Sequence, residues 1–220
     1  MSVKRGLFIT VEGGEGVGKS TNIAFMQQVL EEQGLEGIVT REPGGTPLAE
    51  EIREVLIQNR EEKVVSETEL LLMFAARAQH LYQKILPALE KGICVISDRF
   101  TDATYAYQSG GRGVPANKVA LLEDFVQGDI RPDITFLFDA PIEIGMARAQ
   151  KRGSLDRFEE EEMSFFNRVR DNYLKRASQE SERFKIIDAS QSLDAVQADL
   201  KAKLLERVNR SLSPSKGLAN

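Results

Sequence analysis

A glycine-rich segment near the N-terminus has the residue types and the spacing that bind phosphate. Its sequence is Gly13-Gly14-Glu15-Gly16-Val17-Gly18-Lys19-Ser20, which fits the P-loop pattern of glycine, four residues and then Gly-Lys-Ser/Thr. Glycines let the backbone turn its amides inward around phosphate oxygens, Lys19 reaches the outer phosphates, and Ser20 can coordinate Mg²⁺. This pattern predicts a nucleotide-binding enzyme.

A P-loop alone does not distinguish switches, motors and small-molecule kinases. A GTPase needs a guanine-reading Asn-Lys-x-Asp, and the segment Asn117-Lys118-Val119-Ala120 lacks the aspartate, which disfavours a guanine switch. A translocating or DNA-bound ATPase is an alternative, because residues 134–139 fit an apolar strand that ends in a metal-linked carboxylate. Such an ATPase would show hydrolysis stimulated by its partner.

Apolar runs and periodic segments alternate along the chain and predict the elements that position the P-loop. Short runs rich in β-branched or aromatic residues predict strands, and longer segments with helical periodicity separate them. Strands are expected at Leu7 to Val11, Gly37 to Thr40, Ile93 to Ser97, Ile134 to Asp139 and Phe184 to Asp188. Helices are expected at Thr21 to Gln33, Leu48 to Ile57, Glu67 to Leu89, Lys118 to Phe125, Ile142 to Ala149, Glu159 to Ala177 and Leu193 to Val208.

This alternation predicts an α/β protein of three layers, in which a five-stranded, mainly parallel sheet is flanked by helices. Parallel strands need long crossovers that cover both faces of the sheet, and ligands in such folds gather beyond the carboxyl ends of the strands. Asp98 and Arg99 directly follow the third expected strand, so both should lie at that edge beside the P-loop. There a carboxylate can hold water on Mg²⁺ and a guanidinium can bind phosphate.

Length and charge favour a single domain without a nonspecific affinity for nucleic acid or membrane. The 220 residues allow one large domain, expected at 1–209, followed by a frayed tail at 210–220 that is short of large apolar residues. The 29 Lys and Arg against 34 Asp and Glu give a net charge of −5, which disfavours nonspecific binding to nucleic acid or membrane. No segment approaches the roughly 18 uninterrupted apolar residues of a membrane span.

The single cysteine and the single histidine narrow the chemistry further. Cys94 cannot form an internal disulfide and lies in an apolar run, which predicts a reduced thiol in a strand and a cytoplasmic protein. His80 is the only histidine, so a histidine-based triad or metal cluster cannot be built within one chain. We interpret His80 as a helix residue.

Further segments follow the P-loop in a specific order. They are Thr40-Arg41-Glu42-Pro43-Gly44-Gly45-Thr46, Phe74-Ala75-Ala76-Arg77, Asp98-Arg99-Phe100, Ala106-Tyr107-Gln108 leading to Gly110-Gly111-Arg112-Gly113, and Arg152-Gly153-Ser154-Leu155-Asp156-Arg157. Together with the P-loop, this set closely resembles the bacterial thymidylate kinases over roughly residues 7–208. The resemblance implies a P-loop nucleoside-monophosphate kinase that uses ATP to convert dTMP to dTDP, with Mg²⁺ on Ser20 and Asp98 and a homodimer packed through helices.

On the ATP side, the resemblance implies the P-loop and a lid at about 148–160 that carries arginines. The implied ATP-binding residues are Gly13, Gly14, Glu15, Gly16, Val17, Gly18, Lys19, Ser20, Thr21, Arg148, Arg152 and Arg157. Because the P-loop contains no arginine, the resemblance assigns the catalytic arginine to the lid, at Arg152 or failing that Arg157. The implied catalytic set is Lys19, Arg99, Arg152, Asp98 and Glu15. A solvated helix face is the alternative interpretation of this charged segment.

On the acceptor side, the resemblance implies that Glu15 accepts the sugar 3′-hydroxyl of dTMP. Arg99 and Arg53 hold the acceptor phosphate, and Arg77 hydrogen-bonds the thymine edge. The other implied dTMP residues are Thr104 and Gln108 toward the base, Tyr107 against the deoxyribose, and Glu42 and Pro43 as loop scaffolding.

Each of these residues also has an ordinary structural interpretation. Glu15 would be a solvated loop residue, Arg77 a helix-surface arginine, and Arg53 an exposed partner of Glu50 one turn earlier. Arg99 would belong to a structural ion pair, and Thr104, Tyr107 and Gln108 would be ordinary helix and loop residues. A kinase for another nucleotide or metabolite would share the P-loop and differ at Arg77, Thr104 and Gln108.

One position departs from the pattern of the family, which usually has an aromatic residue four positions before Arg77 to stack on thymine. Met73 occupies that place here, and Phe74 follows it. Phe74 supplies the ring if the helix rotates slightly, whereas the polarizable thioether of Met73 is the alternative cover for the base. Both residues are therefore candidates, and a purely structural role is open for either.

Overall fold

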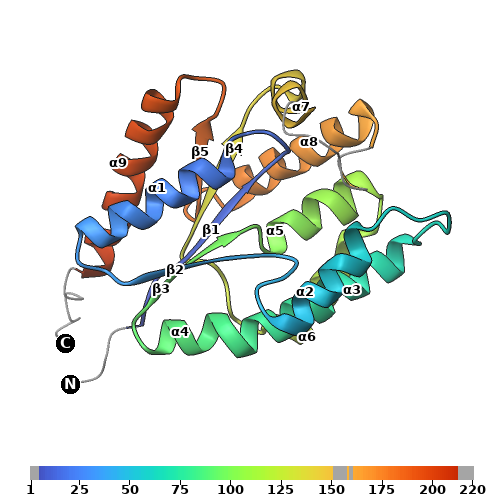
Figure 1. The fold of residues 1–220 in the computed structure, drawn as a ribbon, viewed down its shortest axis with the longest axis horizontal. Helices are drawn as coiled ribbons and strands as arrows, with labels where there is room; N and C mark the ends of the chain where they lie inside the picture. Colours follow the sequence, from blue (N-terminus) through green and yellow to red (C-terminus); the bar gives the residue numbers. More distant parts are fainter. Residues whose placement is uncertain (1–4, 151–157, 159–160, 213–220) are drawn as a thin grey trace.

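A computed structural model describes residues 5–150, 158 and 161–212 of the chain. Within these residues the backbone forms a five-stranded sheet of order β2-β3-β1-β4-β5 in which every neighbouring pair is parallel (Figure 1). The strands are β1 (Phe8–Gly13), β2 (Gly37–Arg41), β3 (Cys94–Asp98), β4 (Ile134–Asp139) and β5 (Phe184–Asp188). The predicted three-layer α/β fold is confirmed, with a sheet that is wholly parallel where mainly parallel was expected.

The position of each strand in the sheet explains its apolar content. The central strands β1 and β4 are buried along nearly their whole length, whereas most residues of the edge strands β2 and β5 are half-buried or exposed. Strand β3 aligns Asp98 with Val11 on one side and with Arg41 on the other. The carboxyl ends of β1, β2 and β3 therefore share one edge, where the P-loop begins.

Helices cover both faces of the sheet. On one face, α1 (Lys19–Glu32) and α9 (Leu193–Leu212) pack against each other, as Figure 1 shows. The other face is covered by α4 (Leu86–Glu90), α5 (Thr101–Thr104), α8 (Met163–Gln179) and the π-helical segments η1 (Leu81–Ile85) and η2 (Tyr105–Gly111). The remaining helices are α2 (Pro47–Ile57), α3 (Ser66–His80), α6 (Ala116–Gln127) and α7 (Ile142–Gln150).

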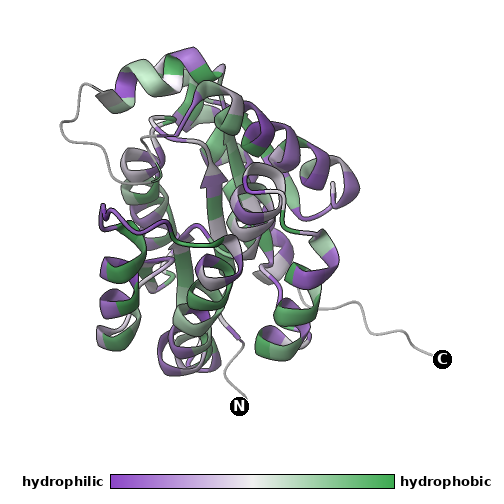
Figure 2. Cartoon of the chain, turned by 90° about the vertical axis from the view of Figure 1, so that its right-hand side faces the viewer, coloured by the Kyte–Doolittle hydropathy of each residue, from purple (hydrophilic) through white to green (hydrophobic). Residues whose placement is uncertain are grey.

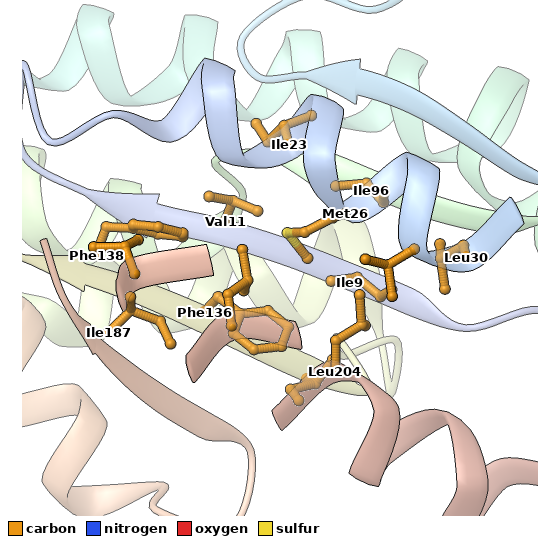
Figure 3. Packing of buried hydrophobic residues seen from close by; sticks show 14 of the residues in the cluster. Ile9, Val11, Ile23, Met26, Leu30, Ile96, Phe136, Phe138, Ile187 and Leu204 are labelled. Atoms are coloured by element: carbon orange, nitrogen blue, oxygen red, sulfur yellow. The ribbon is translucent and has the colours of Figure 1, made fainter. Parts of the chain in front are cut away.

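The main hydrophobic core lies between the sheet and the α1/α9 layer. Ile9 and Val11 of β1 point into it together with Phe136 and Phe138 of β4, and Met26 of α1 packs on them (Figure 3). Alternate strand residues face the opposite layer, where Phe8, Val95 and Leu137 belong to separate clusters. The helices alternate hydrophilic and hydrophobic residues along their ribbons, as expected for elements with one face on a sheet (Figure 2).

Most element boundaries differ from the prediction by a few residues, and the larger differences lie in the helices. The expected helix Glu67 to Leu89 is divided into α3, η1 and α4, because the backbone widens to a π-helix directly after His80. A helical segment at 101–111 has no counterpart among the expected helices, since it carries few residues of an apolar stripe. Helix α9 continues to Leu212, so the first residues of the expected tail are helical.

Among the described residues, none of the helices combines the length and the apolar character required to cross a membrane.

Candidate active site

A cavity of about 510 Å³ opens at the carboxyl edge of the sheet, beside the P-loop. Its walls come from the loop between β1 and α1, the loop after β2, helices α2, α3 and α7, and the segment from β3 through η2. The lining residues are Glu15, Gly16, Val17, Gly18, Lys19, Ser20, Thr21, Arg41, Glu42, Pro43, Arg53, Ile57, Met73, Arg77, Asp98, Arg99, Phe100, Ala103, Thr104, Tyr107, Gln108, Arg148 and Phe158.

The P-loop wraps tightly around the start of α1. Gly18 caps the helix in the left-handed region, with φ 86°, a conformation that glycine adopts without strain. The Lys19 Nζ donates to the carbonyl oxygens of Gly13 at 3.1 Å and Gly14 at 2.6 Å. Burial, followed by the nearby Arg99 guanidinium, lowers the pKa of Lys19 from its ordinary value. The ammonium is thus held inside the loop at the floor of the cavity.

Helix α7 rests directly on the P-loop backbone. A Cβ atom at Gly16 would lie 1.9 Å from the carbonyl oxygen of Gly145, and one at Gly145 would lie 2.4 Å from the carbonyl oxygen of Glu15. Two glycines therefore allow a backbone-to-backbone contact that no larger residue permits. The same helix brings Arg148 to the cavity wall, where its Nη1 donates to the carbonyl oxygen of Ala189 at 3.0 Å.

Arg99 occupies the left-handed region of backbone space, with φ 67°, which is uncommon for a residue with a side chain. Its amide donates to the Val11 carbonyl at 2.9 Å, and the Ser97 hydroxyl donates to the Arg99 carbonyl at 2.7 Å. Next in the chain, the amide of Phe100 donates to Glu12 Oε1 at 2.7 Å. These bonds hold a strained turn, which is typical of functional sites.

Arg99 and Glu15 form the electrostatic centre of the cavity. Arg99 Nη2 donates to Glu15 Oε1 at 2.5 Å, and the Tyr107 hydroxyl donates to the same oxygen at 2.7 Å. The guanidinium also lies over the Tyr107 ring, 4.8 Å from its centroid. Burial raises the pKa of Tyr107 well above its usual range. The Tyr107 hydroxyl therefore keeps its proton and donates its hydrogen bond to Glu15. Together these contacts fix the positions of Arg99, Glu15 and Tyr107.

A second arginine lies deeper, at the far end of the cavity. Arg77 Nε donates to Glu42 Oε2 at 2.7 Å, and Nη2 donates to Thr104 Oγ1 at 2.9 Å. Its Nη1 atom is buried and has no hydrogen-bond partner among the residues that the structure describes. Gln108 is also buried there and donates to Glu69 Oε1 at 2.9 Å. This end of the cavity offers a buried cationic donor to a planar polar ligand.

Ser20 and Asp98 line the cavity where a cation would meet bound phosphates. Asp98 Oδ1 is buried and, within the described part of the chain, accepts no hydrogen bond. An unpaired carboxylate oxygen beside a hydroxyl fits Mg²⁺, which takes one or two carboxylates together with phosphates and water.

Comparison with known proteins connects this geometry to one family. A family model for thymidylate kinase matches residues 11–200. The chain belongs to the thymidylate kinase family. Thymidylate kinases from Pseudomonas putida and Hahella chejuensis are 58% and 59% identical over 199 and 196 residues. These alignments cover 90% and 89% of this chain and 95% and 94% of those proteins.

A solved structure agrees with this assignment. The crystal structure of thymidylate kinase from Ehrlichia chaffeensis matches with a TM-score of 0.74 and 32% sequence identity, covering 92% of this chain and 99% of that chain. The chain is thus a nucleoside-monophosphate kinase that phosphorylates dTMP with ATP, as the resemblance in its motifs implies.

Most residues that were expected on the ATP and dTMP sides of this kinase are brought together in one cavity. Gly13 and Gly14 are not among the described residues that line this cavity; they line a smaller neighbouring pocket, and their carbonyl oxygens accept hydrogen bonds from Lys19. Arg152 and Arg157 lie outside the described residues. Arg53, whose alternative interpretation was an exposed pair with Glu50, is half-buried in the cavity wall, where its Nη1 donates to the Pro43 carbonyl at 3.0 Å.

The prediction for Phe74 requires a correction. Its ring is buried in a cluster with Leu70, Tyr105 and Val119, and it is not among the described residues that line the cavity. Met73 is the one that faces the cavity. Successive residues on a helix point about 100° apart, so only one of the two can reach the ligand.

Several lining residues were not among the predicted sites. Phe100 and Phe158 add aromatic surface, and Ile57 and Ala103 add small apolar contacts. Phe100 lies in the Asp98-Arg99-Phe100 segment, so its place after the strand was a usable signal. Phe158 and Ile57 reach the cavity only through tertiary packing, for which no local pattern exists.

Proposed function

We propose that this cavity aligns ATP and dTMP for direct transfer of the γ-phosphoryl group. The observation that supports the proposal is the arrangement of two cationic regions in one cavity, with the P-loop and Lys19 at one end and Arg77 at the other. Arg99 lines the same cavity, beside Glu15, and its charge acts on Lys19. A P-loop with its ammonium suits a triphosphate, and the separate guanidinium groups suit a nucleoside monophosphate.

On the donor side, backbone amides of the P-loop and the Lys19 ammonium hold the phosphates of ATP. Ser20 and Asp98 would hold Mg²⁺, which neutralises phosphate oxygens when it is bound. A dTMP phosphate oxygen forms the new bond to the γ-phosphorus, while the bond to the β,γ-bridging oxygen breaks and ADP leaves with that electron pair. Lys19 balances the charge that collects on the transferred group.

On the acceptor side, Arg99 and Arg53 hold the phosphate of dTMP in line with ATP. A phosphate monoester has its second pKa near 6 and is mostly dianionic at neutral pH, so the protein needs no general base. Catalysis is therefore mainly alignment and charge neutralisation. Glu15 accepts the 3′-hydroxyl of the sugar, a role that its position between Arg99 and Tyr107 supports.

The deep end of the cavity binds thymine. Arg77 Nη1 donates to the base edge, Thr104 and Gln108 lie beside it, and Met73 covers the ring. One methyl group in an apolar pocket contributes about 1 to 3 kcal/mol, so dUMP should react roughly 10 to 200 times less efficiently than dTMP.

A coupled assay of ADP release across the nucleoside monophosphates tests this assignment. Arg77→Ala should raise the KM for dTMP by about tenfold or more, because it removes a charged donor from a buried site, and should leave the KM for ATP nearly unchanged. Lys19→Ala should instead abolish most transfer. Arg210→Ala, at an exposed position on α9, is the matched control. Equal losses for both substrates in Arg77→Ala would contradict the assignment.

Arg152, or failing that Arg157, acts as the arginine finger of the lid, by resemblance to the family. Such arginines contribute about 10³ to 10⁵ in rate. Arg152→Ala should lower kcat steeply with little change in ATP affinity, and lysine should rescue poorly because it lacks the planar fork. Single-turnover measurements on both arginines decide the assignment, and near-normal rates in both alanine variants would contradict it.

The enzyme forms a homodimer through the outer helices. Phe125 and Leu121 of α6 are 83% and 70% exposed, and Leu71 of α3 is 58% exposed, although all three are large and apolar. Exposed apolar surface of this kind marks interaction sites. Phe125→Lys should shift the mass measured by light scattering from dimer to monomer, and an unchanged mass would contradict this interface.

The enzyme works in the cytoplasm. Cys94 is a buried thiol without a disulfide, and burial raises its pKa, which suits a reducing compartment. Fractionation of cells that express the protein tests this location.

A further inference from the structure

The only histidine of the chain lies behind the wall of the base pocket, in contact with the lining residue Glu42. His80 is fully buried at the end of α3, and both of its ring nitrogens have partners. Nδ1 lies 3.0 Å from Glu42 Oε1, and Nε2 lies 2.7 Å from the Thr40 hydroxyl oxygen. The imidazole therefore connects β2 and the loop after it to the helix that carries Arg77.

Glu42 is the link between His80 and Arg77. Its Oε1 accepts from the imidazole and its Oε2 accepts from Arg77 Nε at 2.7 Å, and all three side chains are buried. Burial would raise the pKa of Glu42, but Arg77 and His80 outweigh it and hold the pKa below its ordinary value. An ionised carboxylate only accepts, so the imidazole carries its proton on Nδ1.

The surroundings leave the imidazole a single position. A Cβ at Gly45 would lie 2.4 Å from His80 Nε2 and 2.6 Å from the Thr40 hydroxyl oxygen, so the glycine backbone closes directly over the ring. On the other side of the network, the Arg77 guanidinium lies 4.7 Å from the ring centroid of Phe74 and 5.2 Å from that of Phe100. The Glu42 carboxylate lies between the two, and His80 is the partner of the oxygen that Arg77 does not contact.

We propose that His80 is a positioning residue for base recognition, which acts through Glu42 to aim Arg77 Nη1 into the cavity. This inference rests on the proposed contact between Arg77 and thymine. Without the imidazole donor, one carboxylate oxygen of Glu42 loses its partner in a buried site, and the carboxylate can rotate and take the guanidinium with it. The consequence is weaker dTMP binding with unchanged chemistry after binding.

Two amide substitutions separate the two contacts of the ring. The amide nitrogen of asparagine is as many bonds from Cβ as Nδ1, whereas that of glutamine corresponds to Nε2. His80→Asn keeps a donor for Glu42 and should leave the KM for dTMP within about threefold of the parent value. His80→Gln loses that donor and should raise it by about tenfold or more, since a hydrogen bond to a charged group contributes that much.

The controls distinguish positioning from general damage. In His80→Gln, kcat and the KM for ATP should stay within about twofold of the parent, and Gln79→Ala, a neighbour on α3, should change neither substrate constant. In the double variant His80→Gln/Arg77→Ala, the KM for dTMP should equal that of Arg77→Ala alone, because the histidine acts only through the arginine.

The outcomes separate this inference from the proposed function. If Arg77→Ala leaves the KM for dTMP unchanged, the proposed base contact is wrong and the inference falls with it. If Arg77→Ala raises the KM but His80→Gln lowers only the melting temperature, or weakens both substrates equally, His80 is merely structural and the inference is overturned. Should His80→Gln fail to fold, Thr40→Val should raise the KM for dTMP several-fold without affecting ATP, and an unchanged KM there overturns the inference.

Discussion

The buried carboxyl group of Glu12 makes the stability of this kinase depend on pH. Glu12 is the last residue but one of β1 and has no exposed surface. Its Oε1 accepts from the Phe100 amide at 2.7 Å, and its Oε2 lies 2.8 Å from the Tyr173 hydroxyl. Burial, followed by the nearby charge of Asp102, raises its pKa from 4.5 to about 8.

The magnitude follows from linkage between proton binding and folding. In the unfolded chain Glu12 ionises near 4.5, whereas in the folded protein it keeps its proton up to about 8. The contribution of Glu12 to the free energy of unfolding is therefore fully present below about pH 4.5 and is lost as the pH rises through about 8. Because each pH unit, a tenfold change in proton concentration, corresponds to about 1.4 kcal/mol, this contribution falls by roughly 3 kcal/mol between about pH 5 and about pH 7.5.

Glu12→Gln removes the titration and keeps an acceptor for the Phe100 amide. The Tyr173 hydroxyl donates to Oε2, so in the variant it must turn to accept from the amide nitrogen, a change that is the same at every pH. We expect denaturant unfolding, carried out on both proteins from about pH 5 to about pH 7.5, to show that the free energy of unfolding of the variant rises by roughly 3 kcal/mol relative to that of the parent.

A second glutamate gives a matched control with the same change in charge. Glu32 is exposed on α1, and its hydrogen bond from Lys201 lowers its pKa below the ordinary value of 4.5, so it titrates below the window of the experiment. Glu32→Gln should therefore show a constant difference from the parent across that window. A constant difference for Glu12→Gln as well would refute the reasoning, since Glu12 would then be ionised in both states.

The remaining predictions concern the cavity and its supports. Met73→Ala should raise the KM for dTMP about threefold to tenfold with a small change in melting temperature, whereas Phe74→Leu should lower stability by about 1 kcal/mol and leave that KM unchanged; steady-state kinetics and thermal unfolding check both. Asp98→Asn should raise the Mg²⁺ concentration for half-maximal activity by about tenfold, as a magnesium titration measures. Gly145→Ala should raise the KM for ATP, because the added Cβ would lie 2.4 Å from the Glu15 carbonyl oxygen and displace the P-loop. This effect is expected even though alanine stabilises a helix by about 1 kcal/mol relative to glycine, and an unchanged KM would show that the P-loop tolerates the displacement.

The parts of the fold that were predictable from the sequence are those with a local cause. The runs at 134–139 and 184–188 are strands with the predicted bounds, because β-branched and aromatic residues there are buried by the sheet itself. The P-loop was predictable for the same reason, since its glycines and Lys19 act through backbone geometry that neighbouring residues determine.

The parts that were missed depend on contacts between distant segments. The choice between Met73 and Phe74 is a question of helix phase, which is set by the packing of α3 on α6 and η2 and by no residue nearby in sequence. His80 was interpreted as an ordinary helix residue because its partners, Thr40 and Glu42, lie about 40 positions earlier in the chain. Networks of this kind become visible only when the topology brings the end of β2 to the end of α3.

An acidic chain that handles two polyanions must place its cations locally, and the cavity does so by alternating them with carboxylates. Arg99 is held by Glu15 and Arg77 by Glu42, so each guanidinium has a defined direction. The carboxylates also oppose the repulsion between neighbouring cations: burial and then the Arg99 charge lower the pKa of Lys19, whereas the Glu15 carboxylate acts to raise it. Groups that are aligned in this way need little rearrangement when the substrates meet, and alignment is the main contribution that phosphoryl transfer requires from the protein.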